Sequence, residues 1–411
     1  MSNTQIWQTL WRMSRVLISS TFLAQILTYA CIPLLTRLYE PIRFGEWGIF
    51  IAIGSAGALI GTWRMESWFI QLSSDLQNGY WRWCIKNLIL TSVILGVLVS
   101  LALPIVFPTM DWSGLWILLP LGIFSQGIFN LLVFRTGADP LQKQHAQLKI
   151  TNAILANGLM IACFSLDLFN GLIEGWVLGQ LLALAWIYPK LPSLNKGNQP
   201  TGWREIVQLP FRPQWLTVQA LLENFQAVGL SAWIGWVYGP LPASLFFMSW
   251  RLLQAPINLI SNSLYLSQYH IAQSWHADNK NYSSMMHKAI LALSIAAAFA
   301  LILWNWSGPE LITTLLGEKW SGTGQVIHAI MPWMLAFFIF SPFSFLLLMH
   351  HKSQWLLGLT VLDSIQKIII LSPLFHFSFT EALQWSSYIS MLIILSQWWI
   401  GRQAEINFEH S

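Results

Sequence analysis

Long apolar stretches separated by short polar connections run through the whole chain. A helix that crosses a membrane needs about 20 mostly apolar residues, because the hydrocarbon core is about 30 Å thick. Twelve such stretches are present, at 15–38, 46–71, 85–107, 113–134, 147–167, 169–188, 213–238, 243–268, 286–306, 324–348, 353–376 and 380–400. With 55% hydrophobic and 9% charged residues, the pattern predicts an all-α integral membrane protein with about 12 transmembrane helices.

The basic residues of the short loops predict how the chain is oriented. If Met1 lies in the cytoplasm and the chain crosses twelve times, fifteen lysine and arginine residues fall in cytoplasmic segments. Only Arg37, Arg43 and Lys319 fall on the other side. This asymmetry follows the positive-inside rule, so we expect both termini in the cytoplasm. The net charge of +4 reflects this topology and gives no reason to expect a nucleic-acid partner.

The chain divides into two similar halves at its longest predicted cytoplasmic loop. This loop, 189–212, separates an N-terminal six-helix lobe, 1–188, from a C-terminal six-helix lobe, 213–411. In each half a predicted helix ends at a tyrosine that is followed two residues later by proline, at Tyr39–Pro41 and Tyr238–Pro240. Because each half has an even number of spans, the lobes would be parallel repeats, a transporter architecture with its site between the repeats.

Ionisable side chains inside the apolar stretches are candidates for a functional site, because a charge in the bilayer is costly and needs a partner or a wet cavity. Arg251 has no acidic neighbour on its own predicted helix, so its partner would come from another helix or from a ligand. Arg64 and Glu66 are two residues apart, which would place them on nearly opposite helix faces. Each of them would then need a partner of its own.

A second group of candidates lies at similar depth in the membrane. Asp363 and Lys367 are four residues apart with the acid first, a spacing that fits a structural pair as well as a site. By helical rise, Lys367 lies at a depth similar to that of Arg251, and Glu223 and Asp363 lie slightly further inward. A cavity between the halves could therefore present two cations near two carboxylates.

Motifs of common enzyme classes are absent from the sequence. There is no G-x-x-x-x-G-K-[ST], H-E-x-x-H or G-x-S-x-G motif, and no two aspartates are separated by one residue. The outer segments are short, and we expect the longest at about 305–323. The cysteines are scattered, and His350 and His351 lack metal-ligand spacing and fit a solvated loop. We therefore expect a transporter without a cofactor or metal, driven by a gradient of H⁺ or Na⁺ or of the substrate.

Four short motifs are similar to those of one transporter family. They are Leu35-Thr36-Arg37-Leu38-Tyr39 with Pro41, Phe44-Gly45 and Arg64-Met65-Glu66; Gly171-Leu172 with Gly175, Gly179 and Gln180; Arg251-Leu252-Leu253-Gln254-Ala255-Pro256; and Leu316-Gly317-Glu318-Lys319-Trp320. Together they resemble the Wzx-type polysaccharide or O-antigen flippases. That family belongs to the multidrug/oligosaccharidyl-lipid/polysaccharide exporter (MOP) superfamily, which also contains the multidrug and toxic-compound extruders (MATE).

The resemblance implies a two-lobed MATE-like fold in the bacterial inner membrane. It also implies translocation of an undecaprenyl-diphosphate-linked oligosaccharide, of the O-antigen or capsule type, during lipopolysaccharide or polysaccharide biosynthesis. A polysaccharide polymerase with its chain-length machinery would be a partner. The substrate-binding candidates are Arg64, Arg251 and Lys367, and the ion-coupling candidates are Glu66, Glu223 and Asp363.

Two other functions fit parts of the sequence. A multidrug or cation antiporter of the same superfamily should have a cavity dominated by acids, whereas this chain places three cations among a similar number of acids. A membrane glycosyltransferase or polymerase would be an enzyme, and the short outer segments and missing motifs disfavour it.

Overall fold

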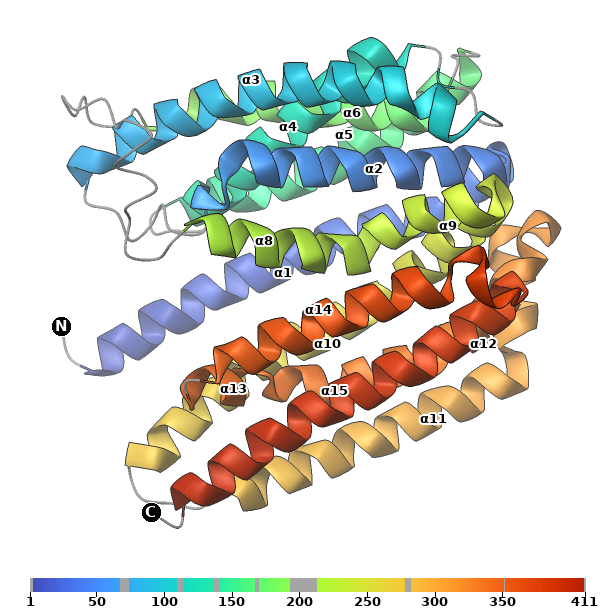
Figure 1. Cartoon of the computed structure of the whole chain (residues 1–411). Coiled ribbons are helices and arrows are strands. Elements are labelled where there is room, and N and C mark those ends of the chain that lie inside the picture. Colours follow the sequence, from blue (N-terminus) through green and yellow to red (C-terminus); the bar gives the residue numbers. More distant parts are fainter. Residues whose placement is uncertain are drawn as a thin grey trace. The chain divides into compact units, whose positions relative to one another are not determined.

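The computed structural model of the protein describes residues 3–66, 74–108, 112, 114–136, 141–166, 170–192, 213–277, 282–350 and 352–409. Within these ranges the regular structure is helical and contains no β strand, which confirms the expected all-α fold (Figure 1). Contacts divide the chain into two compact units, Met1–Pro240 and Leu241–Ser411. Most of the predicted loop 189–212 lies outside the described residues.

The first unit contains the helices that correspond to the first seven predicted stretches. They are α1 (Asn3–Leu38), α2 (Pro41–Thr62), α3 (Ser74–Val106), α4 (Leu115–Thr136), α5 (Gln142–Ser165), α6 (Gly171–Ile187), the 3₁₀ turn η2 (Tyr188–Lys190), α8 (Pro213–Asn224), the π-helical segment η3 (Phe225–Gly229) and α9 (Leu230–Tyr238). The predicted stretches 147–167 and 169–188 are separate helices, because α5 ends before Leu166 and α6 begins after Asn170.

The second unit contains the helices of the remaining predicted stretches. They are α10 (Pro240–Ala277), α11 (Tyr282–Leu316), η4 (Glu318–Trp320), α12 (Ser321–Phe340), η5 (Ser341–Phe343), α13 (Phe345–Met349), α14 (Ser353–Ile370), η6 (Pro373–Phe375) and α15 (Phe379–Glu409). The stretch predicted at 324–348 is broken at η5, which contains Pro342. Proline lacks a backbone donor and interrupts a helix at such a position.

The exposed surface of several helices is apolar, as a bilayer requires. In the described part of the chain, eight helical stretches are long and apolar enough to cross a membrane. On α3 the aliphatic side chains of Leu101 and Ile105 are exposed, and on α11 those of Leu291 and Ile302 are exposed. Such surfaces are unfavourable in water but suit hydrocarbon. The protein is therefore a multi-pass membrane protein.

The structure corrects two predicted boundaries. α2 ends at Thr62 and does not continue to 71, because Trp63 and Arg64 adopt left-handed backbone conformations with φ of 53° and 56°. A left-handed residue after the last helical turn redirects the chain. α11 continues to Leu316, so the outer segment expected at 305–323 is mostly helical. The actual connection to α12 is the short turn of Gly317 and η4.

Glycines on α6 allow its backbone to approach α5 closely. A Cβ atom at Gly175 would lie 2.4 Å from the backbone nitrogen of Met160, and one at Gly179 would lie 2.4 Å from Cα of Ala156. Residues four apart share a helix face, so these two glycines form a groove for α5. Gly171, one further turn back, leaves room for the Tyr39 hydroxyl. That hydroxyl donates to the carbonyl oxygen of Met160 at 2.6 Å and ties the end of α1 to α5.

The seventh predicted stretch packs on α2. α8, η3 and α9 all contact α2. Ser55 Oγ on α2 donates to Asn224 Oδ1 at 2.7 Å, and Asn224 Nδ2 donates to the carbonyl oxygen of Ala52 at 3.4 Å. These contacts group 213–238 with the first compact unit, whereas the sequence assigned it to the second lobe. The division into lobes at 189–212 stays a prediction.

Candidate functional site

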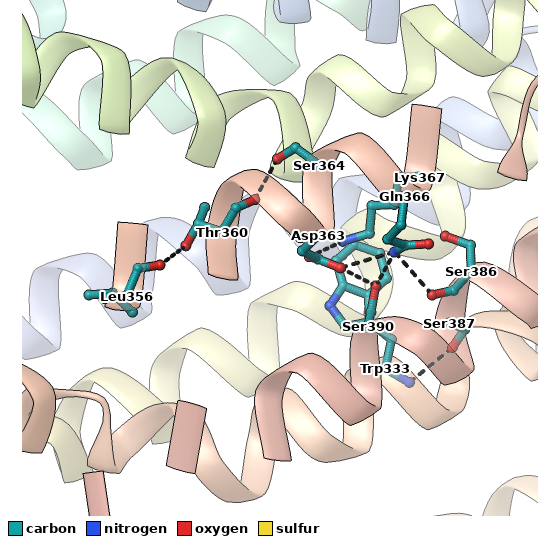
Figure 2. A network of polar contacts seen from close by, with 10 residues as sticks. All are labelled: Trp333, Leu356, Thr360, Asp363, Ser364, Gln366, Lys367, Ser386, Ser387 and Ser390. Atoms are coloured by element: carbon teal, nitrogen blue, oxygen red, sulfur yellow. Dashed lines mark hydrogen bonds and ion pairs between the residues drawn. The ribbon is translucent and has the colours of Figure 1, made fainter. Parts of the chain in front are cut away.

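A network of polar side chains lies in the second unit, where α14 meets α15 (Figure 2). On α14, Asp363, Gln366 and Lys367 are three and four residues apart, so they lie on one face of the helix. On α15, Ser386 and Ser390 are also four residues apart and face them. α14 and α15 follow one another in the chain and pack together. Because these neighbouring helices pack against each other, the polar face of α14 contacts the polar face of α15.

Asp363 is at the centre of this network, because both of its carboxylate oxygens accept hydrogen bonds. Oδ1 accepts from Ser390 Oγ at 2.6 Å and from Gln366 Nε2 at 3.0 Å. Oδ2 accepts from Lys367 Nζ at 2.5 Å. Gln366 Nε2 also contacts Ser390 Oγ at 3.0 Å and the carbonyl oxygen of Ser386 at 3.3 Å. Donors placed around a carboxylate stabilise its charged form.

Lys367 is held between Asp363 and an aromatic ring. Its Nζ lies 3.7 Å from the centre of the Trp333 ring, a cation–π contact in a place that excludes solvent, since Lys367 is only 1% exposed. Trp333 stacks on Trp250 of α10 with ring centres 4.7 Å apart. Its backbone N–H donates to Ser387 Oγ on α15 at 2.9 Å. The ring that contacts the ammonium is thus fixed from two sides.

This arrangement is a buried ion pair whose two charges depend on each other. Removing one partner of such a pair leaves the other charge uncompensated and costs about 3–5 kcal/mol. Loss of the Asp363 charge would therefore make the present position of the Lys367 ammonium unfavourable. No group of histidine, cysteine and acidic side chains in the described ranges could hold a metal ion.

The sequence spacing left two interpretations of Asp363 and Lys367 open, and the structure pairs the two side chains. Lys367 is buried and already engaged by Asp363 and Trp333. A phosphate group could reach its ammonium only after the network opens. Its role as a substrate ligand stays a prediction, and so does the role of Asp363 in ion coupling.

Arg64 and Glu66 lie in the turn that follows α2. The prediction that they occupy opposite faces of a helix is wrong, because the left-handed conformation of Arg64 comes after the helix has ended. Arg64 is partly exposed, whereas Glu66 is 1% exposed. Oε2 of Glu66 makes no hydrogen bond within the described structure. A buried oxygen without a donor is costly, and this keeps Glu66 a candidate for ion coupling.

Glu223 and Arg251 lie in different units. Glu223 is exposed on α8 and accepts a hydrogen bond at 3.1 Å from Gln219 Nε2, one turn earlier. Arg251 is partly exposed on α10, directly after Trp250. Among the contacts described above, one joins two of the candidate residues, and it is the ion pair of Asp363 and Lys367. The predicted group of two cations and two carboxylates stays a prediction.

Two buried acids were not identified from the sequence. Glu46 on α2 is 2% exposed and accepts from Arg43 at 3.1 Å and from Asn170 Nδ2 at 2.7 Å. Arg43 and Glu46 are three residues apart, and this spacing on a helix could have predicted their ion pair from the sequence. Glu405 on α15 is fully buried and lies 2.8 Å from Nε2 of His350. The interpretation of His350 as part of a solvated loop is therefore wrong, and His351 lies outside the described residues.

The contact between His350 and Glu405 predicts a stability effect. His350→Ala removes the imidazole from a fully buried carboxylate. We expect a loss of about 1–3 kcal/mol, the usual penalty for a buried polar group that loses its partner. Thermal unfolding of the purified protein in detergent measures this loss. His328→Ala, at an exposed position of α12, should unfold at the temperature of the parent chain, and equal midpoints for both variants would contradict the prediction.

An ion pair buried among the apolar helices of a membrane fold is a feature that is common in membrane-transport proteins. The sequence profile of the family described as "Polysaccharide biosynthesis protein" matches residues 34–325, which is more than half of the chain. The chain belongs to this polysaccharide biosynthesis protein family. No curated protein sequence matches it significantly.

Solved transporter structures share the fold over nearly the whole chain. An inward-facing multidrug resistance MATE family transporter of the MOP superfamily has a TM-score of 0.59 at 14% identity, and the alignment covers 94% of this chain and 96% of that one. A MATE in complex with MaL6 has a TM-score of 0.54 at 14% identity, with coverages of 97% and 96%. A MOP superfamily transporter from Pyrococcus furiosus has a TM-score of 0.51 at 13% identity, with coverages of 97% and 95%. At these identities the likeness shows a shared MOP-type fold.

Proposed function

We propose that the protein is a flippase that moves a polyprenyl-diphosphate-linked oligosaccharide from the inner to the outer leaflet of the bacterial inner membrane. The observation that carries this proposal is the family match over residues 34–325 on a chain with a transporter fold. Both termini would lie in the cytoplasm. The glycan would be a repeat unit of the O-antigen or capsule type, delivered to a polymerase on the outer side. Alternating access, the mechanism typical of transporters built from repeats, would move the headgroup.

Arginine side chains are the proposed ligands of the diphosphate. Arg251 and Arg64 are both partly exposed. Guanidinium is planar and donates two parallel hydrogen bonds to phosphate oxygens. Sugars need a polar, hydrated path, whereas the polyprenyl chain stays in the bilayer. Lys367 would join the arginines only after its contact with Asp363 is broken.

The Asp363–Lys367 pair is the proposed coupling element. A proton or Na⁺ that neutralises Asp363 would release the buried ammonium of Lys367, and the second unit would have to rearrange around it. The ammonium would then be available to the anionic headgroup. Glu66 and Glu223 are further candidates for coupling, and the burial of Glu66 favours it over the exposed Glu223.

Deletion of the gene tests the proposed function. We expect lipid-linked repeat units to accumulate in the inner leaflet, because synthesis continues while translocation stops. The measurement is extraction of the lipid-linked glycan, together with its accessibility to a periplasmic glycosidase in intact spheroplasts. Expression of the parent chain should make the glycan accessible again.

Other outcomes identify other functions. Accumulation of repeat units in the outer leaflet would indicate a polymerase and contradict the flippase. Unchanged glycan together with increased sensitivity to cationic drugs would indicate a multidrug antiporter.

A further inference from the structure

A shallow apolar groove lies along α15, C-terminal to the serines that contact Asp363 and Gln366. Its volume is about 350 Å³, and it is lined by Leu392, Leu395, Ser396, Trp398, Trp399 and Ile400. Leu392 and Trp399 are more than half exposed. Exposed apolar side chains beside a groove are suited to contact with lipid, because lipid chains are as apolar as the side chains themselves.

Arg402 lies at the C-terminal end of this groove. Its guanidinium carbon is 5.5 Å from the centre of the Trp398 ring and 5.7 Å from that of Trp399. Its Nε is buried and donates to no atom of the described structure. None of the ion pairs between described side chains includes Arg402. The nearest acid along the helix, Glu405, is engaged by His350. The groove therefore ends at a positive charge without a described counter-ion.

The length of α15 from its first turn to Arg402 matches the thickness of a bilayer core, which would put Arg402 at a membrane surface if Glu381 lies at the opposite one. The helix begins with a capping box, in which Ser378 N and Oγ donate to Glu381 Oε2 at 3.0 and 2.7 Å and the Glu381 N–H donates back to Ser378 Oγ at 3.4 Å. Glu381 is exposed, so this end meets a polar environment. Arg402 follows Glu381 by 21 residues, a distance of about 31 Å along the helix. This equals the thickness of the hydrocarbon core, about 30 Å.

We propose that Arg402 and the groove on α15 form a binding site for an anionic phospholipid. The lipid phosphate would accept hydrogen bonds from the Arg402 guanidinium, and an acyl chain would lie along the groove from Trp399 toward Leu392. Three properties of the site favour this occupant: a cation with no counter-ion among the described side chains, its depth at the headgroup level, and tryptophans of the kind that line membrane interfaces. The proposal is independent of the glycan substrate, because it uses neither the ion pair nor Arg64 or Arg251.

Thermal unfolding in mixed micelles tests the site. The purified protein is held in detergent with phosphatidylcholine, and phosphatidylglycerol is then added at constant total lipid. A ligand that binds only the folded state raises the unfolding temperature. We expect phosphatidylglycerol to raise the midpoint of the parent chain. Arg402→Ala should lose more than half of that shift, and Arg402→Lys should keep an intermediate part of it.

Two further variants distinguish lipid binding in this groove from a general attraction of anionic lipid to the protein's positive charge. Ser396→Trp fills the groove and leaves Arg402 intact, so it should also reduce the shift. Arg82→Ala removes an exposed arginine from α3 and should keep the full shift. If Arg402→Ala unfolds before it can be measured, Ser396→Trp and Arg402→Lys decide the result.

Three results would overturn the proposal. The first is an equal shift for the parent chain, Arg402→Lys and Ser396→Trp, which would place the lipid elsewhere. The second is an equal shift with added phosphatidylcholine, which would exclude recognition of the anionic headgroup. The third is an Arg402-dependent shift with undecaprenyl phosphate but none with phosphatidylglycerol, which would make the groove an isoprenoid site.

Discussion

An Arg251→Ala protein is expected to reach the membrane in normal amount and to lose most glycan export. In the proposed mechanism its guanidinium holds the diphosphate through two charge-assisted hydrogen bonds. Each hydrogen bond to a charged group contributes about 1.5–3 kcal/mol, so the loss of even one of them should lower export about ten- to hundredfold. The measurement is exported glycan normalised to the amount of protein in the membrane.

Two variants control this result. Arg251→Lys should recover only part of the export, because lysine keeps the charge but lacks the planar fork. Lys288→Ala, an exposed cation on α11 of the same unit, should export normally. If the Arg251→Ala protein is stable and exports as much as the parent chain, Arg251 is outside the substrate site. The strongest residue-level argument for an anionic substrate is then lost.

Asp363→Asn is expected to reduce the amount of folded protein sharply. Asparagine keeps the shape of the side chain but removes the charge that compensates Lys367, which is 1% exposed. The cost of leaving that ammonium buried is about 3–5 kcal/mol, a large part of the stability of an ordinary domain. Protein abundance in membranes and the unfolding temperature in detergent measure the effect. Glu310→Gln, at an exposed acid on α11, should leave both unchanged.

The double variant Asp363→Asn with Lys367→Met separates structure from coupling. Methionine fills much of the space of the lysine chain without its charge, so abundance should recover. If the double variant folds but does not export, the pair takes part in the transport cycle. If it folds and exports normally, the pair only stabilises the fold, and the coupling role proposed for Asp363 is excluded. Failure of the double variant to recover abundance would contradict the ion-pair explanation of the single variant.

The helical fold could be read from the sequence, because apolar stretches of membrane length have few alternatives to a helix. The end of α2 could not. The apolar stretch predicted at 46–71 extends beyond the end of the helix, and the helix is ended by the left-handed backbone of Trp63 and Arg64, where no glycine or proline marks the stop. The end of α11 was missed for the opposite reason. The polar residues within 305–323 predict an outer loop, but the helix continues through Pro309 to Leu316.

The candidate site was predictable only where its partners are close in sequence. Asp363 and Lys367 are one helical turn apart, so their spacing indicated a pair. Trp333 and Ser390 complete the network from α12 and α15, and no local pattern marks them. The same holds for His350 and Glu405, which are 55 positions apart in the chain. Such residues meet only when the helices pack together, so their pairing could not be predicted from the sequence alone.

The π-helical segment Phe225–Gly229 sets the rotation of α8 relative to α9 within the seventh helix. A π turn holds about one residue more than an α turn, and one residue corresponds to about 100° of rotation. If this segment became α-helical, α8 would turn by about that angle relative to α9, and Asn224 would leave Ser55 on α2. Glu223, which lies on α8, would rotate about the helix axis by the same angle. The single extra residue held in this π turn therefore determines which face of α8 meets α2.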